Sequence, residues 1–195
     1  MIDAAQAPLP ADLRGLLDEF DAIERDAEAI VDPLDDDQFN WSSRRGAWSI
    51  AQCVAHLNAM NAIYFDALAR AVDEARRAGL ARRDAIRSTW AGRRFIASLE
   101  PPPRLKLRAP RRSAPPAVRR YKAEVWPEFV RFHAHLRREL GAMATVDLNR
   151  AAFPNPFLGP LVRVRAGTGL RIIAAHERRH VWQASRVLES EGFPR

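Results

Sequence analysis

The spacing of apolar residues along the chain predicts a helical protein. Apolar side chains recur every three or four positions in four long segments, which is the period of one face of an α-helix. These segments cover about 11–31, 49–77, 117–142 and 169–190 of the 195 residues. In the first segment the stripe consists of Leu13, Leu16, Leu17, Phe20, Ile23, Ala27 and Ile30.

Local signals indicate where several of these helices begin. Ser49 and Gln52 have the spacing of a capping box, which places the start of the second helix at Ser49. Thr168 is expected to cap the last helix. Pro127 lies inside the third segment, so it is expected either to kink that helix or to mark its true start.

The connections between the helices are long and rich in proline. The basic connection over about 100–117 contains "PPPRLKLRAPRRSAPP", which has too many prolines for a continuous helix or a central strand. "AGRRFIASLE" before it is compatible with a short helix, and the alternating "LVRVR" with a brief extended segment. We therefore predict a single all-α domain over 1–195, a four-helix bundle with long crossover connections.

Composition narrows the class of protein. The chain is 47% hydrophobic and 28% charged, which is ordinary for a soluble globular protein. No apolar stretch is long enough for a membrane span, and the first residues do not have the pattern of a signal peptide. Cys53 is the single cysteine, so no intrachain disulfide can form, and we expect it in the core. These features favour a cytoplasmic protein without a membrane partner.

Charge is distributed unevenly. The net charge is +7, but residues 1–40 hold twelve acidic and two basic side chains, so the remainder carries +17. Either an acidic helix packs among basic ones, or a basic surface binds nucleic acid or a small anion. Residues 104–120 contain seven lysines and arginines and no acid. Aromatic residues do not interrupt this run and no recognition helix is evident, so a basic nucleic-acid-binding or interaction protein is the alternative rather than the leading hypothesis.

The last predicted helix contains "AAHERRHVWQASR", with an H-E-x-x-H motif at residues 176–180. His176 and His180 are one helical turn apart, so their rings can converge on one ion. Both lie on the apolar side of the helix, where buried histidines need partners. Either a metal ion or ordinary core contacts would supply them. In zinc metalloproteases the same motif binds zinc, and its glutamate is the general base.

The surroundings of the motif argue against a zinc metalloprotease. The third ligand of those enzymes follows the motif, but Gln183 and Arg186 occupy the positions of the glycine and histidine that one form requires. Only residues 181–195 remain after His180 to supply another. Glu177 is rotated by about 100° from His176 around the helix, so an ion pair with a neighbouring arginine explains it as well as a catalytic role does. Glu177 and Gln183 remain the candidate catalytic residues.

The other histidines differ in what their positions allow. His56 borders the apolar stripe of the second helix, and a bundle can bring it beside His176 and His180. Three histidines with open coordination positions are typical of a reactive zinc site. His133 and His135 point in nearly opposite directions on a helix, so they cannot act as a pair, and we expect the first in the core or a pocket and the second exposed.

These stretches resemble the DinB-like superfamily, which includes bacillithiol transferases and mycothiol-dependent maleylpyruvate isomerase. "DPLDDDQFNWSSRRGAWSIAQCVAHLNAMNAIYF" is similar to the family's loop and second helix, with its metal-ligand histidine at His56. "NPFLGPLVRVRAGTGLRIIAAHERRHVWQASRV" is similar to the family's final stretch, in which H-x-x-x-H followed by Gln corresponds to His176, His180 and Gln183. The resemblance covers nearly the whole chain.

The resemblance implies both a site and a class of chemistry. It implies a divalent metal, zinc or nickel, held by His56, His176 and His180, in a bundle with crossover topology. It also implies a metal-dependent enzyme acting on a small molecule, either a hydrolase that activates water or a thiol S-transferase with a low-molecular-weight thiol as co-substrate. A homodimer is compatible with it. If the basic connection overhangs the cleft, Arg104, Lys106 and Arg108 are candidates for binding an anionic substrate.

Overall fold

The structure is a computed structural model that describes residues 8–103, 109–115 and 117–195. Arg104, Lys106 and Arg108, the candidate substrate-binding residues of the basic connection, lie outside these described residues. Within the described part of the chain, no helix combines the length and the apolar character that a membrane span needs.

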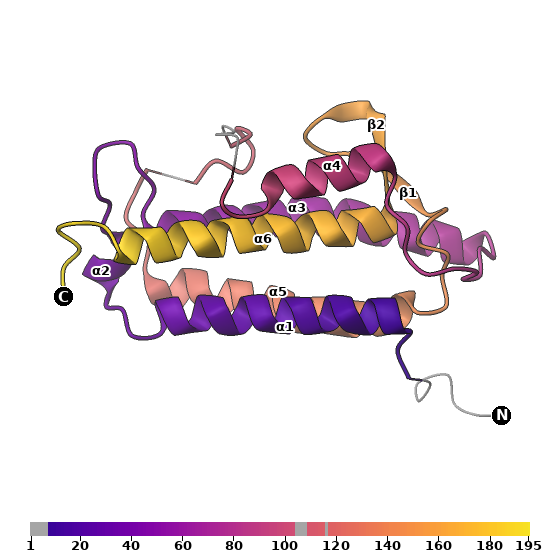
Figure 1. Cartoon of the computed structure of the whole chain (residues 1–195), viewed down its shortest axis with the longest axis horizontal. Helices are drawn as coiled ribbons and strands as arrows, with labels where there is room; N and C mark the ends of the chain where they lie inside the picture. The colour runs from indigo at the N-terminus through magenta and orange to yellow at the C-terminus, as the bar shows by residue number, and fades with distance from the viewer. Residues whose placement is uncertain (1–7, 104–108, 116) are drawn as a thin grey trace.

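Four long helices pack side by side around one apolar core (Figure 1). The helices are α1 (Ala11–Val31), α3 (Ile50–Arg77), α5 (Lys122–Met143) and α6 (Ala166–Leu188). Each turns its apolar stripe inward because burying that surface is the main favourable contribution to folding. The largest fully buried side chains of these helices include Leu13, Phe20, Ile50, Leu57, Leu68, Phe129, Leu136 and Leu140.

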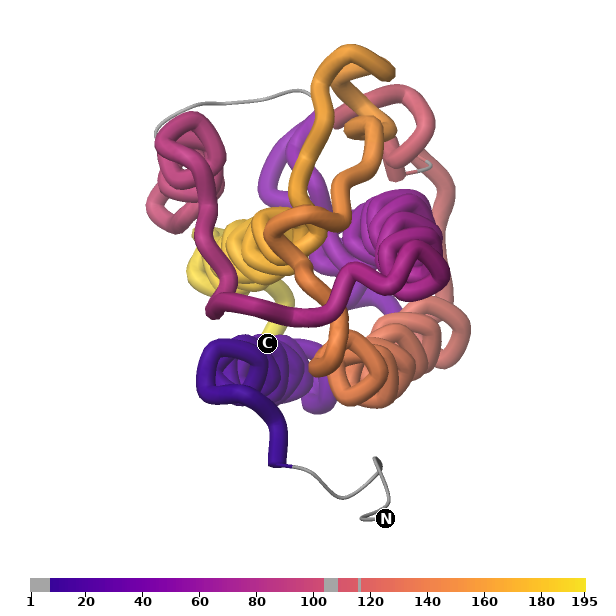
Figure 2. The backbone as a smooth tube through the Cα atoms, turned by 90° about the vertical axis from the view of Figure 1, so that its right-hand side faces the viewer, coloured from indigo at the N-terminus to yellow at the C-terminus, as the bar shows by residue number. Residues whose placement is uncertain are grey.

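The order of the helices in space explains the long connections. α1 and α3 each pack against both α5 and α6, so α1 and α3 occupy opposite corners, as the end-on view in Figure 2 shows. In Figure 1, α3 and α5 run in the same direction, and α1 and α6 run in the other. Two neighbouring parallel helices need a connection that returns along the bundle. The all-α fold with a long crossover connection is therefore confirmed.

The crossover between α3 and α5 contains the short helix that the sequence suggested. This helix, α4 (Trp90–Leu99), begins at Thr89, whose side chain accepts a hydrogen bond from the Gly92 N–H at 3.1 Å. It packs against α6 on the outside of the bundle (Figure 2). Further along the same connection, Ser113 contacts His56 of α3.

A small antiparallel hairpin, β1 (Ala152–Asn155) and β2 (Gly159–Arg165), precedes α6. The alternating "LVRVR" belongs to β2, whereas β1 was not predicted. Because β2 leads directly into α6, this helix begins at Ala166 and not after Thr168. Thr168 is therefore not its cap; it lies inside the first turn, 5% exposed.

The first N–H groups of α6 are satisfied by the main chain. The Ala166 N–H donates to the Ala151 carbonyl at 2.8 Å, and the Gly167 N–H donates to the Leu148 carbonyl at 3.0 Å. The segment that enters β1 therefore does what a side-chain cap would otherwise do.

α5 begins later than the predicted 117. Its first residue is Lys122, whose N–H donates to the Asp36 carboxylate at 2.7 Å. Asp36 belongs to α2 (Asp36–Asn40), a short helix that the apolar pattern did not predict. Pro127 lies inside α5, so it does not mark the start of the helix.

Candidate metal centre

The N-terminal cap of α3 sets the direction in which His56 points. The Ser49 side chain accepts a hydrogen bond from the Gln52 N–H at 3.2 Å, and the Gln52 side chain accepts one from the Ser49 N–H at 3.1 Å. The predicted capping box is thus confirmed. It fixes the first turn, so His56, two turns further on, faces α6.

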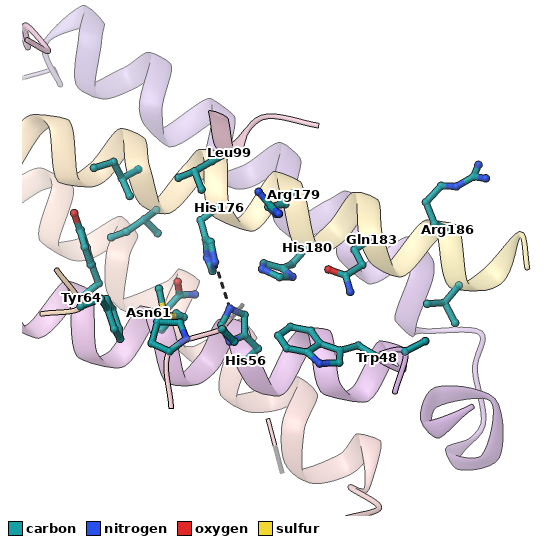
Figure 3. A pocket seen from close by; sticks show the side chains of 18 of the residues that line it. Trp48, His56, Asn61, Tyr64, Leu99, His176, Arg179, His180, Gln183 and Arg186 are labelled. Carbon is teal, nitrogen blue, oxygen red and sulfur yellow. Dashed lines mark hydrogen bonds between the residues drawn. The ribbon is translucent and has the colours of Figure 1, made fainter. Parts of the chain in front are cut away.

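Three histidines meet between α3 and α6 (Figure 3). One nitrogen from each of His56, His176 and His180 lies within 4.8 Å of the others. The Nε2 atoms of His56 and His176 are 3.3 Å apart. Two nitrogens bound to one tetrahedral zinc at about 2.0–2.1 Å are separated by roughly the same distance. The three side chains can therefore hold one metal ion.

The burial of these histidines also supports an ion-binding site. His56 is 2% exposed and His180 7%, while His176 opens to the adjoining pocket. The Nδ1 atom of His180 is buried without a hydrogen-bond partner among the residues that the structure describes. A buried polar atom without a partner is costly, and a ligand or an ion nearby is one explanation for its persistence.

The ring of His56 is oriented by a hydrogen bond to a residue outside α3. Its Nδ1 lies 2.6 Å from the carbonyl oxygen of Ser113, which is 1% exposed and belongs to the crossover connection. A carbonyl oxygen can only accept, so this contact holds the proton on Nδ1 and leaves the Nε2 lone pair toward the other histidines. A metal-binding histidine normally has such a partner on its other nitrogen.

The environment keeps the imidazoles neutral. Burial, followed by the charges of His56 and Arg179, lowers the pKa of His176 to about 3. Burial also lowers the pKa of His180, with further lowering from His176, His56 and Arg179 and an opposing hydrogen bond with Gln183. Burial is again the main cause of the lowered pKa of His56. Neutral imidazole is the form that binds a metal.

Trp48, which lies just before the N-terminus of α3, packs against two of the three imidazoles. Its ring stacks on His180 with centroids 5.6 Å apart and an interplanar angle of 21°, and its centroid is 5.0 Å from that of His56. Contact with two of the three imidazoles restricts their movement.

Glu177 does not take part in an ion pair with a neighbouring arginine, which was one of the two interpretations of its position. Its side chain is fully buried and turns away from the three histidines into the core. The Asn61 side-chain N–H donates to it at 2.6 Å, and its other oxygen is 3.4 Å from Nε2 of His133. Arg178 instead pairs with Glu19 and Glu100. Glu177 is not among the residues that line the pocket described below.

The remaining sequence expectations concern single residues. His133 is 1% exposed in the core and His135 is exposed, as predicted. Cys53 is buried, and burial raises the pKa of its thiol to about 12, so it is not a nucleophile. Gln183 lies beside His180 and lines the pocket.

A pocket of about 680 Å³ opens over the histidines, a volume typical of small-molecule sites. Its walls come from α3, α4, α6, the hairpin and the two loops that precede α3 and α5. Among the described residues, three arginines contribute to the wall, together with a larger number of apolar side chains. The arginines are Arg44, Arg179 and Arg186, and the larger apolar residues are Trp48, Met60, Tyr64, Phe95, Leu99, Phe157, Leu158, Ile172, Ile173 and Val187.

Several of these contributions could not have been found by sequence reasoning. The Ser113 carbonyl has no side-chain signature, and Asn61 and Arg179 lie in helical segments where a polar residue is ordinary. Sequence reasoning did not single out Trp48 either. Its place one residue before the capping box of a histidine-bearing helix is the one signal that could have pointed to it.

The chain was compared with models of protein families, and the result agrees with the helical fold and the three-histidine site. The family model described as the DinB superfamily matches residues 19–184, which is more than half of the chain. The matched range runs from within α1 to within α6 and includes all three histidines of the site. No curated protein and no solved structure matches the chain.

Proposed function

The chain belongs to the DinB superfamily, and we propose that it is a metal-dependent enzyme in which His56, His176 and His180 hold a divalent ion, zinc or nickel. The observation that carries this proposal is the convergence of three neutral imidazoles, two of them buried, at the base of a pocket large enough for a small molecule. Three protein ligands leave at least one position open to a substrate or a water molecule.

A divalent ion in such a site supplies a nucleophile near neutral pH because it lowers the pKa of a bound water or thiol. The residues of the chain prepare the surroundings. The Ser113 carbonyl keeps the His56 proton on Nδ1, and Trp48 packs against the rings of His56 and His180. The positive charge of Arg179, which already affects both neighbouring histidines, favours an anionic nucleophile. The reaction is either hydrolysis or transfer to a low-molecular-weight thiol.

Metal analysis of the purified protein tests the site. The wild-type chain, loaded with zinc or nickel and desalted, should retain about one ion per chain. His180→Ala should lose it, while His135→Ala, which removes an exposed histidine of α5, should retain it. A wild-type protein that keeps no stoichiometric metal would overturn the proposal.

The crossover connection supports an anionic substrate. Ala109 and Pro110, which directly follow the basic run along the chain, line the pocket. We propose that Arg104, Lys106 and Arg108 contribute positive charge toward the substrate. Neutralising all three should weaken turnover of anionic substrates, or of an anionic thiol, more than that of neutral ones. An unchanged selectivity profile would count against this role.

Two further assays separate the reaction types and the alternative function. Activity measured with and without added thiol distinguishes a transferase, which requires the thiol, from a hydrolase. Filter binding of nucleic acid at two salt concentrations tests the alternative of a basic binding protein, for which binding should be tight and strongly weakened by salt. We propose a small molecule as the partner, in a cytoplasmic protein that can also form a homodimer.

A further inference from the structure

The three histidines divide the pocket into two parts of different chemistry (Figure 3). Toward the C-terminal end of α6 the wall carries Gln183 and Arg186. Toward the other end lies a part that we call the distal lobe, formed by Met60, Tyr64, Phe157, Ile172 and Ile173. The distal lobe is apolar except near its end.

Tyr64 contributes a hydroxyl group to this apolar lobe. It is 4% exposed, and its hydroxyl is buried without a hydrogen-bond partner in the described part of the chain. Its ring is held edge-on by Phe153, with centroids 5.2 Å apart, and lies parallel to Phe157 at 6.4 Å. Burial raises the pKa of the hydroxyl, so it stays protonated and can donate. Buried hydroxyls usually have a partner, and Tyr64 is one of the residues that line the pocket.

Two asparagines line the pocket: Asn155, and Asn61, which lies between Tyr64 and His56 (Figure 3). The Asn155 side-chain oxygen accepts from the N–H groups of Phe157 and Leu158 at 2.9 and 3.0 Å, so its amino group remains for another acceptor. Asn61 uses its amino group on Glu177, so its oxygen remains for a donor. Together with Tyr64, they give the pocket the hydrogen-bonding capacity to recognise a polar group.

The separation between Tyr64 and the histidines sets the length of a ligand. Tyr64 follows His56 by eight residues on α3. At a rise of about 1.5 Å per residue, the two positions are about 12 Å apart along the helix axis. A molecule that reaches both must be elongated.

We propose that the distal lobe binds the apolar body of an elongated substrate that carries a hydrogen-bond acceptor, such as a carbonyl or carboxamide oxygen, at the end remote from its reacting group. The Tyr64 hydroxyl donates to that acceptor, and the reacting group lies at the three histidines. This assignment names a substrate class for the proposed metal-dependent function and rests on it.

Binding of two matched probes to the zinc-loaded protein tests the proposal. Both are linear hydroxamic acids, whose hydroxamate group chelates zinc, and they are compared over a series of chain lengths. One ends in a methyl group and the other in a carboxamide, and their affinities are measured by calorimetry. At the chain length that spans the lobe, the carboxamide should bind about three- to tenfold more tightly, which is the contribution of one neutral hydrogen bond.

Tyr64→Phe should abolish this preference and leave the affinity of the methyl probe unchanged. Tyr121→Phe, which alters a tyrosine that is 55% exposed at the start of α5, should retain the preference. No preference at any chain length in the wild type, or an equal preference in Tyr64→Phe, would overturn the proposal. If neither probe binds and the protein retains no zinc, the metal site itself fails, which is a distinguishable result.

Thermal unfolding tests whether the effect of Tyr64→Phe is due to a change in the stability of the protein. Tyr64→Phe keeps the ring that packs against Phe153 and Phe157, and it removes a hydroxyl that has no partner in the described chain. Its Tm should therefore equal or exceed that of the wild type. A clearly lower Tm would mean that the hydroxyl bonds within the protein, and that result would contradict the proposed role.

Discussion

Replacing Glu177 shows whether the glutamate of the H-E-x-x-H motif is a catalytic base or a structural residue. If this glutamate is a general base, Glu177→Gln should reduce turnover by about 10²- to 10⁴-fold. The structure predicts a much smaller effect, because the carboxylate is fully buried, faces the core and contacts Asn61 and His133. It links α6 to α3 and α5 beside the metal centre.

The size of the effect on stability follows from these contacts. Glutamine can still accept from Asn61 and approach His133, so Glu177→Gln changes a charged hydrogen bond into a neutral one and should cost about 1 kcal/mol. Glu177→Ala leaves both partners unpaired beside a cavity and should cost about 3–5 kcal/mol. Glu189→Gln, at an exposed position at the end of the same helix, should change stability by less than about 0.5 kcal/mol.

Urea unfolding and steady-state kinetics on the same three variants provide the measurements. We expect Glu177→Gln to retain the bound metal and to keep kcat/KM within about tenfold of the wild type, and Glu177→Ala to be strongly destabilised. A loss of several orders of magnitude in kcat for Glu177→Gln, with metal content and stability unchanged, would refute the interpretation of Glu177 as a structural residue.

Two further predictions concern pH and packing. His176 has a pKa of about 3 in the folded protein, below the ordinary value of 6.5, so the unfolded state binds its proton first. As pH falls between these values, His176 alone should cost the metal-free protein about 1.4 kcal/mol of stability per pH unit, and the lowered pKa values of His56 and His180 add to this loss. His176→Ala should therefore reduce the slope in urea titrations without removing it. A Cβ on Gly167 would lie 2.7 Å from the Ile86 side chain, so Gly167→Ala should destabilise the protein by about 1–3 kcal/mol. A Cβ on Gly15 would meet nothing within 4 Å, so Gly15→Ala should stabilise the protein by up to about 1 kcal/mol. Calorimetric Tm values of the two variants in the opposite order would contradict the packing argument.

The parts of the fold that could be predicted are those that a local pattern determines. The stripe of α1 and the capping box at Ser49 involve residues within one or two turns of each other. The same holds for His176 and His180, whose spacing alone brings them to one side of α6. Their meeting with His56 could be proposed because two amphipathic helices of a bundle must face each other, and because of the family resemblance.

The parts that could not be predicted depend on contacts between distant segments. The start of α6 depends on the segment just before β1, whose carbonyls satisfy its first N–H groups, so Thr168 was wrongly predicted as the cap. The start of α5 depends on Asp36, which is 86 residues away from Lys122. Glu177 was ambiguous because only the packed core reveals that Asn61 and His133 lie beside it.

The hydrogen bond between His56 and the Ser113 carbonyl has a consequence for how this chain can diverge. Every amino acid has a main-chain carbonyl, so the orientation of His56 does not depend on which residue occupies position 113. The side chain there must only be small enough for a buried position, because Ser113 is 1% exposed. The orientation of His56 depends on the path of the connection. Relatives should therefore tolerate substitutions around this position, while insertions and deletions between α4 and α5 would displace the oxygen and release the ring.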